Sequence, residues 1–139
     1  MRIKSLLGHS IIWLAVASSF TILLTAASLY KFILSPFDVD LDNGDKVLHF
    51  VAYAILALVW FFCAFFSTKI KYTYTKILAL VAIFCAFYGV LMEVAQGFLT
   101  TYRTMDYKDA LANTSGIVFV VIILIISKQS VLKWKNSKR

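Results

Sequence analysis

The chain has 139 residues, of which 61% are hydrophobic, and its mean hydropathy of +0.83 exceeds that of a water-soluble domain, where roughly half of the residues are apolar. This composition excludes a globular domain that exposes polar surface on every side. The net charge of +7 would suggest a nucleic-acid partner in a soluble protein. Here the basic residues lie between and beside apolar runs, so we expect no nucleic acid and interpret the charge as membrane topology.

Four apolar runs predict four transmembrane helices. A spanning helix needs about 17–25 mostly apolar residues, and stretches such as VWFFCAFF and GIVFVVIILII lack the alternation of a membrane β-strand. The first run is longer than the apolar core of about 7–15 residues in a signal peptide, so cleavage is the less favoured alternative. We expect an all-α membrane bundle forming a single domain over residues 1–139, with helices at about 10–31, 47–66, 75–99 and 108–127 and a basic tail at 128–139.

Basic residues are distributed unevenly between the two ends of these helices. With four spans both termini lie on one side, and that side holds ten of the 14 basic residues, against four on the other: Lys31, Lys46, Arg103 and Lys108. All seven acidic residues lie toward the side with few basic residues. Because cytoplasmic loops are enriched in Lys and Arg, we expect cytoplasmic termini and an outward-facing group of acids.

The second run opens with the polar stretch DKVLHFVAY at residues 45–53. Asp45 and His49 are four residues apart and share one face of a helix, and Tyr53 continues that face one turn deeper. Lys46 is either an ordinary interfacial charge or a ligand for an anionic group. The expected helix therefore carries an acid, an imidazole and a phenol on one face at its outer end.

The third run contains an acid, Glu93, between two glycines at a spacing of four, Gly89 and Gly97. Glycine lets another helix approach closely, so the pattern predicts that Glu93 faces the interior of the bundle, with Gln96 beside it. A charged residue in a spanning helix costs about 2.5–3.5 kcal/mol on insertion scales and is a functional hypothesis by default. The alternative is a structural salt bridge from Glu93 to Arg103 or Lys46.

The fourth run begins with polar residues at helical spacing. Asp109 and Asn113 are four residues apart, and Asp106 precedes them. Ala112 and Gly116 form a small-xxx-small face that favours close helix packing. The acid and the amide could simply cap the helix and bond within the bundle. Alternatively, they join the groups that the second and third helices bring to the same outer level.

Known catalytic motifs are absent from the sequence. It holds no GxSxG, Walker loop or HExxH pattern. His49, Glu93, Asp45 and Asp109 could supply metal ligands, but one histidine makes this signal weak, and we expect no metal and no cofactor. A hard cation held by carboxylates and a metal-free acid/base site stay open as alternatives.

The order of these polar stretches resembles the VanZ-like family of membrane proteins. DKVLHFVAY, EVAQ and RTMDYKDALANTSG are similar to that family's pattern of D-K-x-x-H-F-x-x-Y, E-x-x-Q, and R followed by D-x-x-x-N-x-x-G, over residues 45 to 116. The pattern falls on Asp45, Lys46, His49, Phe50, Tyr53, Glu93, Gln96, Arg103, Asp109, Asn113 and Gly116, and Asp106 suits an acidic position after the arginine. The resemblance implies a multi-pass protein of the bacterial cytoplasmic membrane, in a family whose best-known member is associated with resistance to the glycopeptide teicoplanin.

Binding is the favoured hypothesis for the outer polar residues. In it, an outward-facing pocket binds a lipid-linked cell-wall precursor or an anionic membrane lipid. Lys46 and Arg103 hold a phosphate or carboxylate, since arginine suits a bidentate grip. The remaining pocket residues orient the headgroup: Tyr53, Gln96, Asp106, Asp109 and Asn113.

Two other hypotheses stay open. In the first, the protein is an intramembrane enzyme acting on a lipid-linked substrate, with Glu93 or His49 as the general base, Asp45 orienting His49, and Arg103 stabilising negative charge. In the second, the chain is an assembly partner for other envelope proteins. The sequence shows no activated nucleophile, which is why binding is favoured over catalysis.

Overall fold

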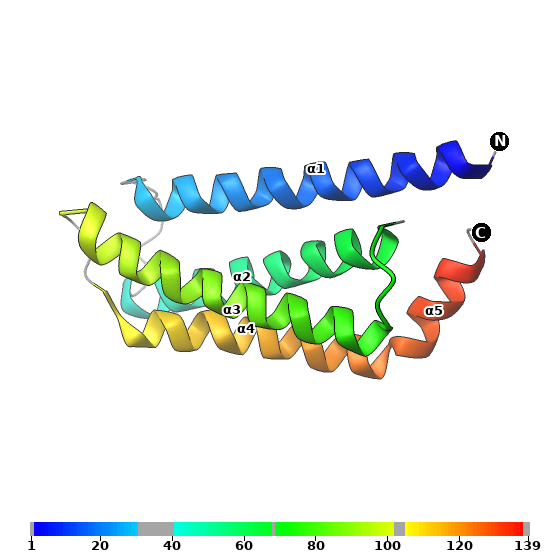
Figure 1. Ribbon diagram of the computed structural model, residues 1–139. Coiled ribbons are helices and arrows are strands. Elements are labelled where there is room, and N and C mark those ends of the chain that lie inside the picture. Colours follow the sequence, from blue (N-terminus) through cyan, green and yellow to red (C-terminus); the bar gives the residue numbers. More distant parts are fainter. Residues whose placement is uncertain (1, 31–40, 68, 102–104, 138–139) are drawn as a thin grey trace.

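The computed structural model describes residues 2–30, 41–67, 69–101 and 105–137, and the side chains of 2–9 and 41–43 are not described. Helices are the regular elements of these residues: α1 (Arg2–Leu29), α2 (Leu41–Phe66), α3 (Tyr74–Leu99), α4 (Tyr107–Ile126) and α5 (Lys128–Ser137). The long helices α1 to α4 run side by side, and both termini lie at one end, which we call the terminal end (Figure 1). The opposite end, where α2 and α4 begin and α3 ends, is the cluster end.

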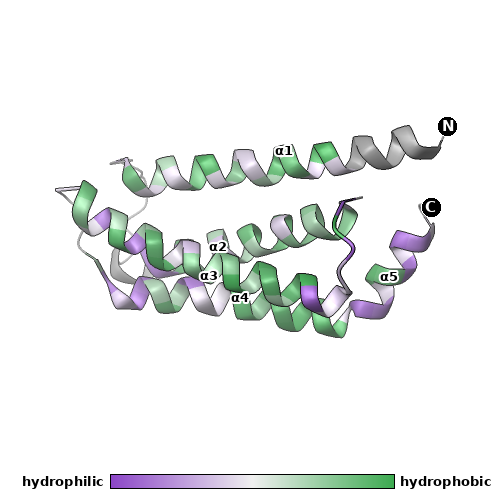
Figure 2. Cartoon of the chain, in the orientation of Figure 1, coloured by the Kyte–Doolittle hydropathy of each residue, from purple (hydrophilic) through white to green (hydrophobic). Residues whose placement is uncertain are grey.

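Four helices are long and apolar enough to cross a membrane, as predicted. Their spanning segments are Ser10–Leu29, Gly44–Phe66, Tyr74–Leu99 and Tyr107–Ile126, with hydropathies between 1.9 and 2.4. Apolar residues dominate their middle, whereas hydrophilic residues gather toward the two ends of the bundle (Figure 2). The protein is therefore a multi-pass membrane protein, and its large exposed apolar side chains, such as Phe87 and Ile122, face lipid.

Three features differ from the predicted helices. Helix α1 begins at Arg2 rather than near residue 10, although its apolar spanning segment begins at Ser10. Helix α2 begins at Leu41 rather than near residue 47, so Asp45 lies inside the helix. The basic tail forms a helix, α5, which has no buried residue but lays Trp134 against Phe66, with ring centroids 5.0 Å apart. Its amphipathic face was missed because lysines separate the few apolar residues, so the segment lacks the apolar run that marks a span.

Helices α2 and α4 pack closely against each other, and Gly116 is the reason. A Cβ atom at this position would collide with the carbonyl oxygen of Phe50 and lie 3.0 Å from its carbonyl carbon and 3.1 Å from the Ala54 nitrogen. These are backbone atoms, which cannot move without moving α2. The small face predicted at Gly116 is thus confirmed, and it brings the N-terminal halves of α2 and α4 together.

Apolar and aromatic side chains fill the terminal half of the bundle. The Phe61 ring packs edge-on against the Tyr74 ring at 5.1 Å, and Phe65 stacks on Phe61 at 5.4 Å. The Tyr74 hydroxyl donates to the Leu124 carbonyl at 2.6 Å, so the polar end of this ring is satisfied. This half acts as a rigid apolar base for the polar groups at the cluster end.

Helix α1 is the least buried of the four spanning helices. Only 6% of its spanning window is buried, against 33% for each of the other three. Hydrogen bonds compensate for this small apolar contact: the Trp60 indole donates to Thr21 at 3.0 Å, and the Thr25 and Tyr88 hydroxyls lie 2.7 Å apart. The compact core of the bundle is therefore α2, α3 and α4, which are the helices that supply the polar groups.

Candidate functional site

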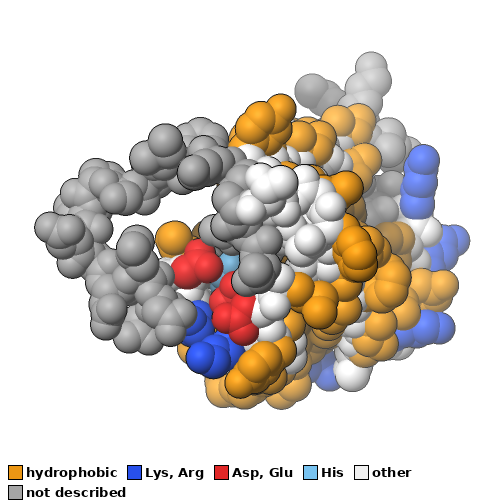
Figure 3. All heavy atoms as spheres, turned by 90° about the vertical axis from the view of Figure 1, so that its left-hand side faces the viewer, with side chains coloured by type: hydrophobic (Ala, Val, Ile, Leu, Met, Phe, Trp, Pro, Cys, Tyr) orange, Lys and Arg blue, Asp and Glu red, His pale blue; other side chains and the backbone are white. Residues whose placement is uncertain are grey.

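Three helices bring five polar side chains together at the cluster end. We call this group the polar cluster: Asp45 and His49 of α2, Glu93 of α3, and Asp109 and Asn113 of α4. Acidic side chains, a histidine and lysines gather at this end of the molecule in Figure 3. All five residues were among those singled out from the sequence, and the roles assigned to them stay predictions.

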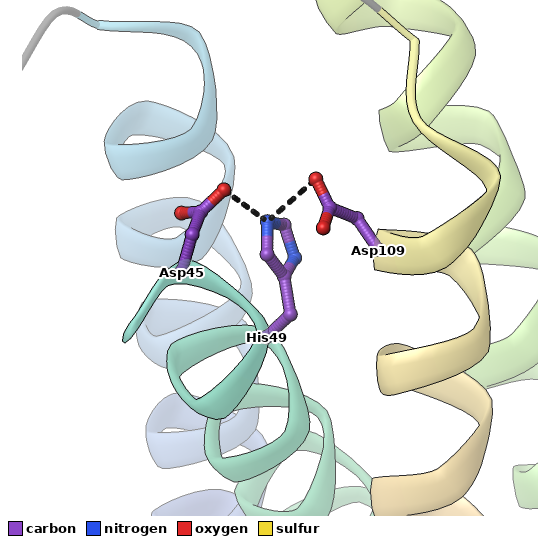
Figure 4. A group of neighbouring side chains, drawn as sticks. All are labelled: Asp45, His49 and Asp109. Carbon is purple, nitrogen blue, oxygen red and sulfur yellow. Dashed lines mark ion pairs between the residues drawn. The ribbon is translucent and has the colours of Figure 1, made fainter. Parts of the chain in front are cut away.

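His49 lies at the centre of the polar cluster and is 9% exposed. Its Nδ1 lies 3.1 Å from the Asn113 Oδ1, which is hydrogen-bonding distance. Its Nε2 lies 3.8 Å from the Asp45 Oδ2 and 3.7 Å from the Asp109 Oδ2, and it points between these two carboxylates (Figure 4). Both separations exceed the roughly 2.7–2.9 Å of a charge-assisted hydrogen bond, so a gap remains on this side of the ring.

Asn113 connects the histidine to Glu93. Its Nδ2 donates to the Glu93 Oε1 at 3.3 Å, while its Oδ1 faces the His49 Nδ1. An amide oxygen only accepts, so the His49 Nδ1 carries a hydrogen, and a neutral ring then has its lone pair on Nε2. Asn113 therefore fixes the tautomer of His49 from a position with 2% exposure.

Glu93 faces the interior of the bundle, as predicted. It is 3% exposed, and its Oε1 lies 3.9 Å from the His49 Nδ1. Its Oε2 is buried and has no hydrogen-bond partner within the described part of the chain. The flanking glycines differ from the expectation, because Gly89 is buried and makes room for the Tyr53 ring rather than for a helix backbone, and Gly97 is exposed beside Met105.

Tyr53 lies directly below the cluster, one turn deeper on α2. Its ring would be 3.0 Å from a Cβ atom at position 89, and its hydroxyl is close enough to Glu93 for an electrostatic interaction. That hydroxyl is buried with no hydrogen-bond partner among residues the structure describes. Tyr53 and Glu93 thus leave two polar atoms of this region available to a ligand or water.

Gln96 is buried but does not join the polar cluster. Its Nε2 donates to the Ser28 carbonyl of α1 at 3.1 Å. The spacing of three residues from Glu93 placed it on a neighbouring face of α3, and the structure shows that this face meets α1. This contact holds α3 to α1, and the binding role expected for Gln96 has no support from the geometry.

The remaining predicted residues lie at the rim of the cluster end. Asp106 is the N-cap of α4, and its Oδ1 accepts from the Lys108 backbone nitrogen at 2.9 Å. Lys108 is exposed, and Lys46 is half-buried and interacts electrostatically with Asp109. Arg103, which was expected to hold an anion, lies outside the described residues.

This arrangement can do two kinds of chemistry. The Nε2 lone pair of a neutral His49 could accept a proton, with Asp45 and Asp109 stabilising the resulting imidazolium. The same atoms could also hold a cation, because Asp45, His49 and Asp109 each offer one ligand atom and these atoms lie within 4.8 Å of one another. Neither chemistry requires a covalent nucleophile.

Comparisons with known proteins identify a family and nothing more specific. A family model described as VanZ/LLP1 matches residues 6–128, which is most of the chain. The matched region includes α2, α3 and α4 in full, with every residue of the polar cluster. No curated protein and no solved structure matches the chain.

Proposed function

The chain belongs to the VanZ/LLP1 family, and we propose that its polar cluster binds the phosphate-bearing headgroup of a lipid-linked cell-envelope precursor, or of an anionic lipid, in the bacterial cytoplasmic membrane. The observation that carries this proposal is the unsatisfied Oε2 of Glu93 in a buried polar cluster. Buried polar groups in a spanning bundle are costly, and they persist where a ligand satisfies them.

The proposed topology places the cluster on the outer face. Both termini and the short α2–α3 connection lie at the terminal end, where the basic residues are concentrated (Figure 1). The positive-inside rule then makes the terminal end cytoplasmic. The polar cluster would meet lipids of the outer leaflet, where envelope precursors carry their polar headgroups.

Different parts of the headgroup would bind at the rim and at the centre of the site. Lys46 and Lys108 lie beside the cluster, and lysine suits a phosphate as a mobile point charge. The centre is acidic, so it favours the hydroxyl, amine or amide groups of a headgroup rather than its phosphates. A molecule with a charged phosphate and a polar, hydrogen-donating part therefore fits better than a simple anionic lipid.

A link to glycopeptide resistance would follow from masking or redistributing precursors. An antibiotic that recognises a lipid-linked precursor binds less of it when the headgroup is held in another site. This consequence depends on headgroup binding, and the two are tested separately. We expect a chain that binds precursors in vitro to reduce teicoplanin susceptibility only when it is abundant enough to compete.

The binding test compares two variants in nanodiscs by native mass spectrometry with a polyprenyl diphosphate-linked glycan. Glu93→Gln keeps the shape of the side chain and should lose retained lipid. Thr114→Ala is the matched control, because Thr114 follows Asn113 on α4 but is exposed, and its hydroxyl donates to the Ala110 carbonyl of the same helix. Equal retention by both variants would remove the cluster from the binding site and favour an assembly partner.

A second candidate function is an intramembrane enzyme acting on the same lipid-linked class. The observation in its favour is the fixed tautomer of His49, whose free Nε2 lone pair faces two carboxylates, as a general base requires. Incubation of the purified protein with the glycan-linked lipid, followed by mass analysis, separates the two functions. A product that appears with the wild type and not with His49→Ala would favour catalysis.

A further inference from the structure

We infer that Asp45, His49 and Asp109 form a binding site for one divalent metal ion, of the zinc or manganese class, at the cluster end. Sequence reasoning expected no metal, because a single histidine is a weak signal. The geometry brings the three ligand atoms within 4.8 Å of one another. The inference about the metal stands by itself, and its extension to phosphate headgroups rests on the function proposed above.

The first argument is the direction of the His49 lone pair. Asn113 accepts from Nδ1, so a neutral ring presents an acceptor at Nε2, and two carboxylate oxygens, also acceptors, face it at 3.7 and 3.8 Å. Three acceptors that point at a common gap repel one another unless something positive lies between them. Two bonds of about 2.0–2.2 Å to a shared ion span up to about 4.4 Å, which covers both of the separations between Nε2 and a carboxylate oxygen.

The second argument is charge. Asp45, Glu93 and Asp109 bring three carboxylates to a site whose histidine and Asp109 are 9% and 7% exposed. Glu93 and Asp109 are the buried carboxylates, so a proton on His49 would offset only one of their two negative charges, whereas a divalent ion offsets both. The long distances to Nε2 also argue against a proton alone, which would draw one carboxylate to within about 2.9 Å.

The third, independent argument comes from Glu93. It is 3% exposed, its Oε1 lies 3.9 Å from the His49 ring, and its Oε2 has no hydrogen-bond partner in the described ranges. Glu93 lies on the Nδ1 side of the ring, where Asn113 links the two residues by donating to the Glu93 Oε1, and such hydrogen-bonded outer partners orient a metal ligand. The other nitrogen of His49 is fixed by Asn113, as is usual for a histidine that binds a metal.

The chemistry of the three ligand atoms favours an ion of the zinc or manganese class. One imidazole suits zinc and other transition metals, and two carboxylates suit manganese and zinc, whereas calcium and magnesium prefer all-oxygen sites. Three protein ligands leave coordination positions open. An open position on a cation gives an acidic cluster a means of binding a phosphate, so a metal would reconcile the charge of the site with the proposed headgroup.

The experiment measures the metal alone in purified protein. Wild type is stripped with chelator, dialysed against Zn²⁺ or Mn²⁺ with Mg²⁺ and Ca²⁺ as comparisons, and its metal content is determined by elemental mass spectrometry. We expect one Zn²⁺ or Mn²⁺ per chain, with affinity weakened roughly 100-fold in Asp109→Asn and in Asp45→Asn, because each removes a ligand rather than an outer partner. Asp45 has a side chain 36% exposed, so its variant keeps the test valid if Asp109→Asn fails to fold.

Asp106→Asn is the matched control. It removes one carboxylate of the same charge at the same end, it keeps the helix cap, and Asp106 is not among the three ligands. An equal loss of metal affinity in all three variants would mean that the ion responds only to the overall negative charge of this end, and it would overturn the site. A wild type that retains no ion would overturn it as well. A protein that retains metal but no lipid would uphold the metal site and reject the proposed function. A protein that retains lipid in chelator but binds no metal would reject the metal site and uphold the proposed function.

Discussion

Replacing Gly116 by alanine should separate α2 from α4 and disturb the polar cluster. The new methyl group would collide with the Phe50 carbonyl oxygen and crowd the Ala54 nitrogen, both of which belong to the backbone of α2. Side-chain rotation cannot relieve this contact, so the two helices must move apart. Because His49 is one residue before Phe50 and Asp109 lies two turns before Gly116, the shift also lengthens the contacts of His49 across the interface.

The expected change in the free energy of unfolding of Gly116→Ala combines two opposing effects. Overpacking costs about 1–3 kcal/mol, and a rigid backbone contact belongs at the upper end. Alanine recovers about 1 kcal/mol of helix propensity relative to glycine. The net loss of about 2 kcal/mol corresponds to roughly a 30-fold change in the folding equilibrium.

Two other glycines provide internal controls for a thermal melt in detergent. At Gly89 the added Cβ would lie 3.0 Å from the Tyr53 Cε1, and a ring can tilt, so Gly89→Ala should cost less than Gly116→Ala. Gly97 is exposed, and its Cβ would lie 3.2 Å from the Met105 Cβ, so Gly97→Ala should be neutral or stabilising through propensity. A Gly116→Ala protein as stable as Gly97→Ala would refute the close contact of α2 and α4.

Three further predictions concern the cluster and the topology. Asn113→Leu leaves the His49 Nδ1 and the Glu93 Oε1 unpaired, so stability should fall by about 1–2 kcal/mol in the same melt; an unchanged melt would contradict the bridging role. Glu93→Gln should melt like the parent or higher while headgroup binding falls, because functional sites often sacrifice stability; a large loss of stability with retained binding would make Glu93 a structural ion-pair partner. In intact cells, an impermeant thiol reagent should label Asp42→Cys and not Lys71→Cys, because the basic asymmetry places position 71 in the cytoplasm; the reverse labelling would invert the topology.

The four spans were predictable because the hydrocarbon core of a membrane requires long apolar helices, and such helices are visible in the sequence as long apolar runs. Helix α5 was not, because lysines interrupt its apolar face and its contacts with α2, which include Trp134 on Phe66 and Lys135 on Phe65, leave no apolar run in the sequence. The early start of α2 was also missed, since the residues from Leu41 to Lys46 are polar on average and form a helix by continuing one that apolar residues stabilise.

The site was predictable within each helix and not between helices. Spacing of four placed Asp45 with His49 and Asp109 with Asn113, and it holds without any knowledge of packing. Which nitrogen of His49 meets Asn113, and that Gln96 turns toward Ser28, depend on how the helices are rotated against one another. That rotation follows from the contact at Gly116, whose exact partners the sequence does not name.

Photo-crosslinking with a lipid diphosphate that carries a photoreactive headgroup tests the proposed binding site most directly. The polar cluster competes with one other candidate for an anionic headgroup, the basic helix α5 with Lys133 and Trp134 at the terminal end. We predict crosslinks in the peptides containing His49 and Asp109 that unlabelled lipid diphosphate removes and that Glu93→Gln weakens, while Thr114→Ala leaves them unchanged. Competed crosslinks confined to α5, or spread over the lipid-facing surface of the spans, would contradict headgroup binding by the polar cluster.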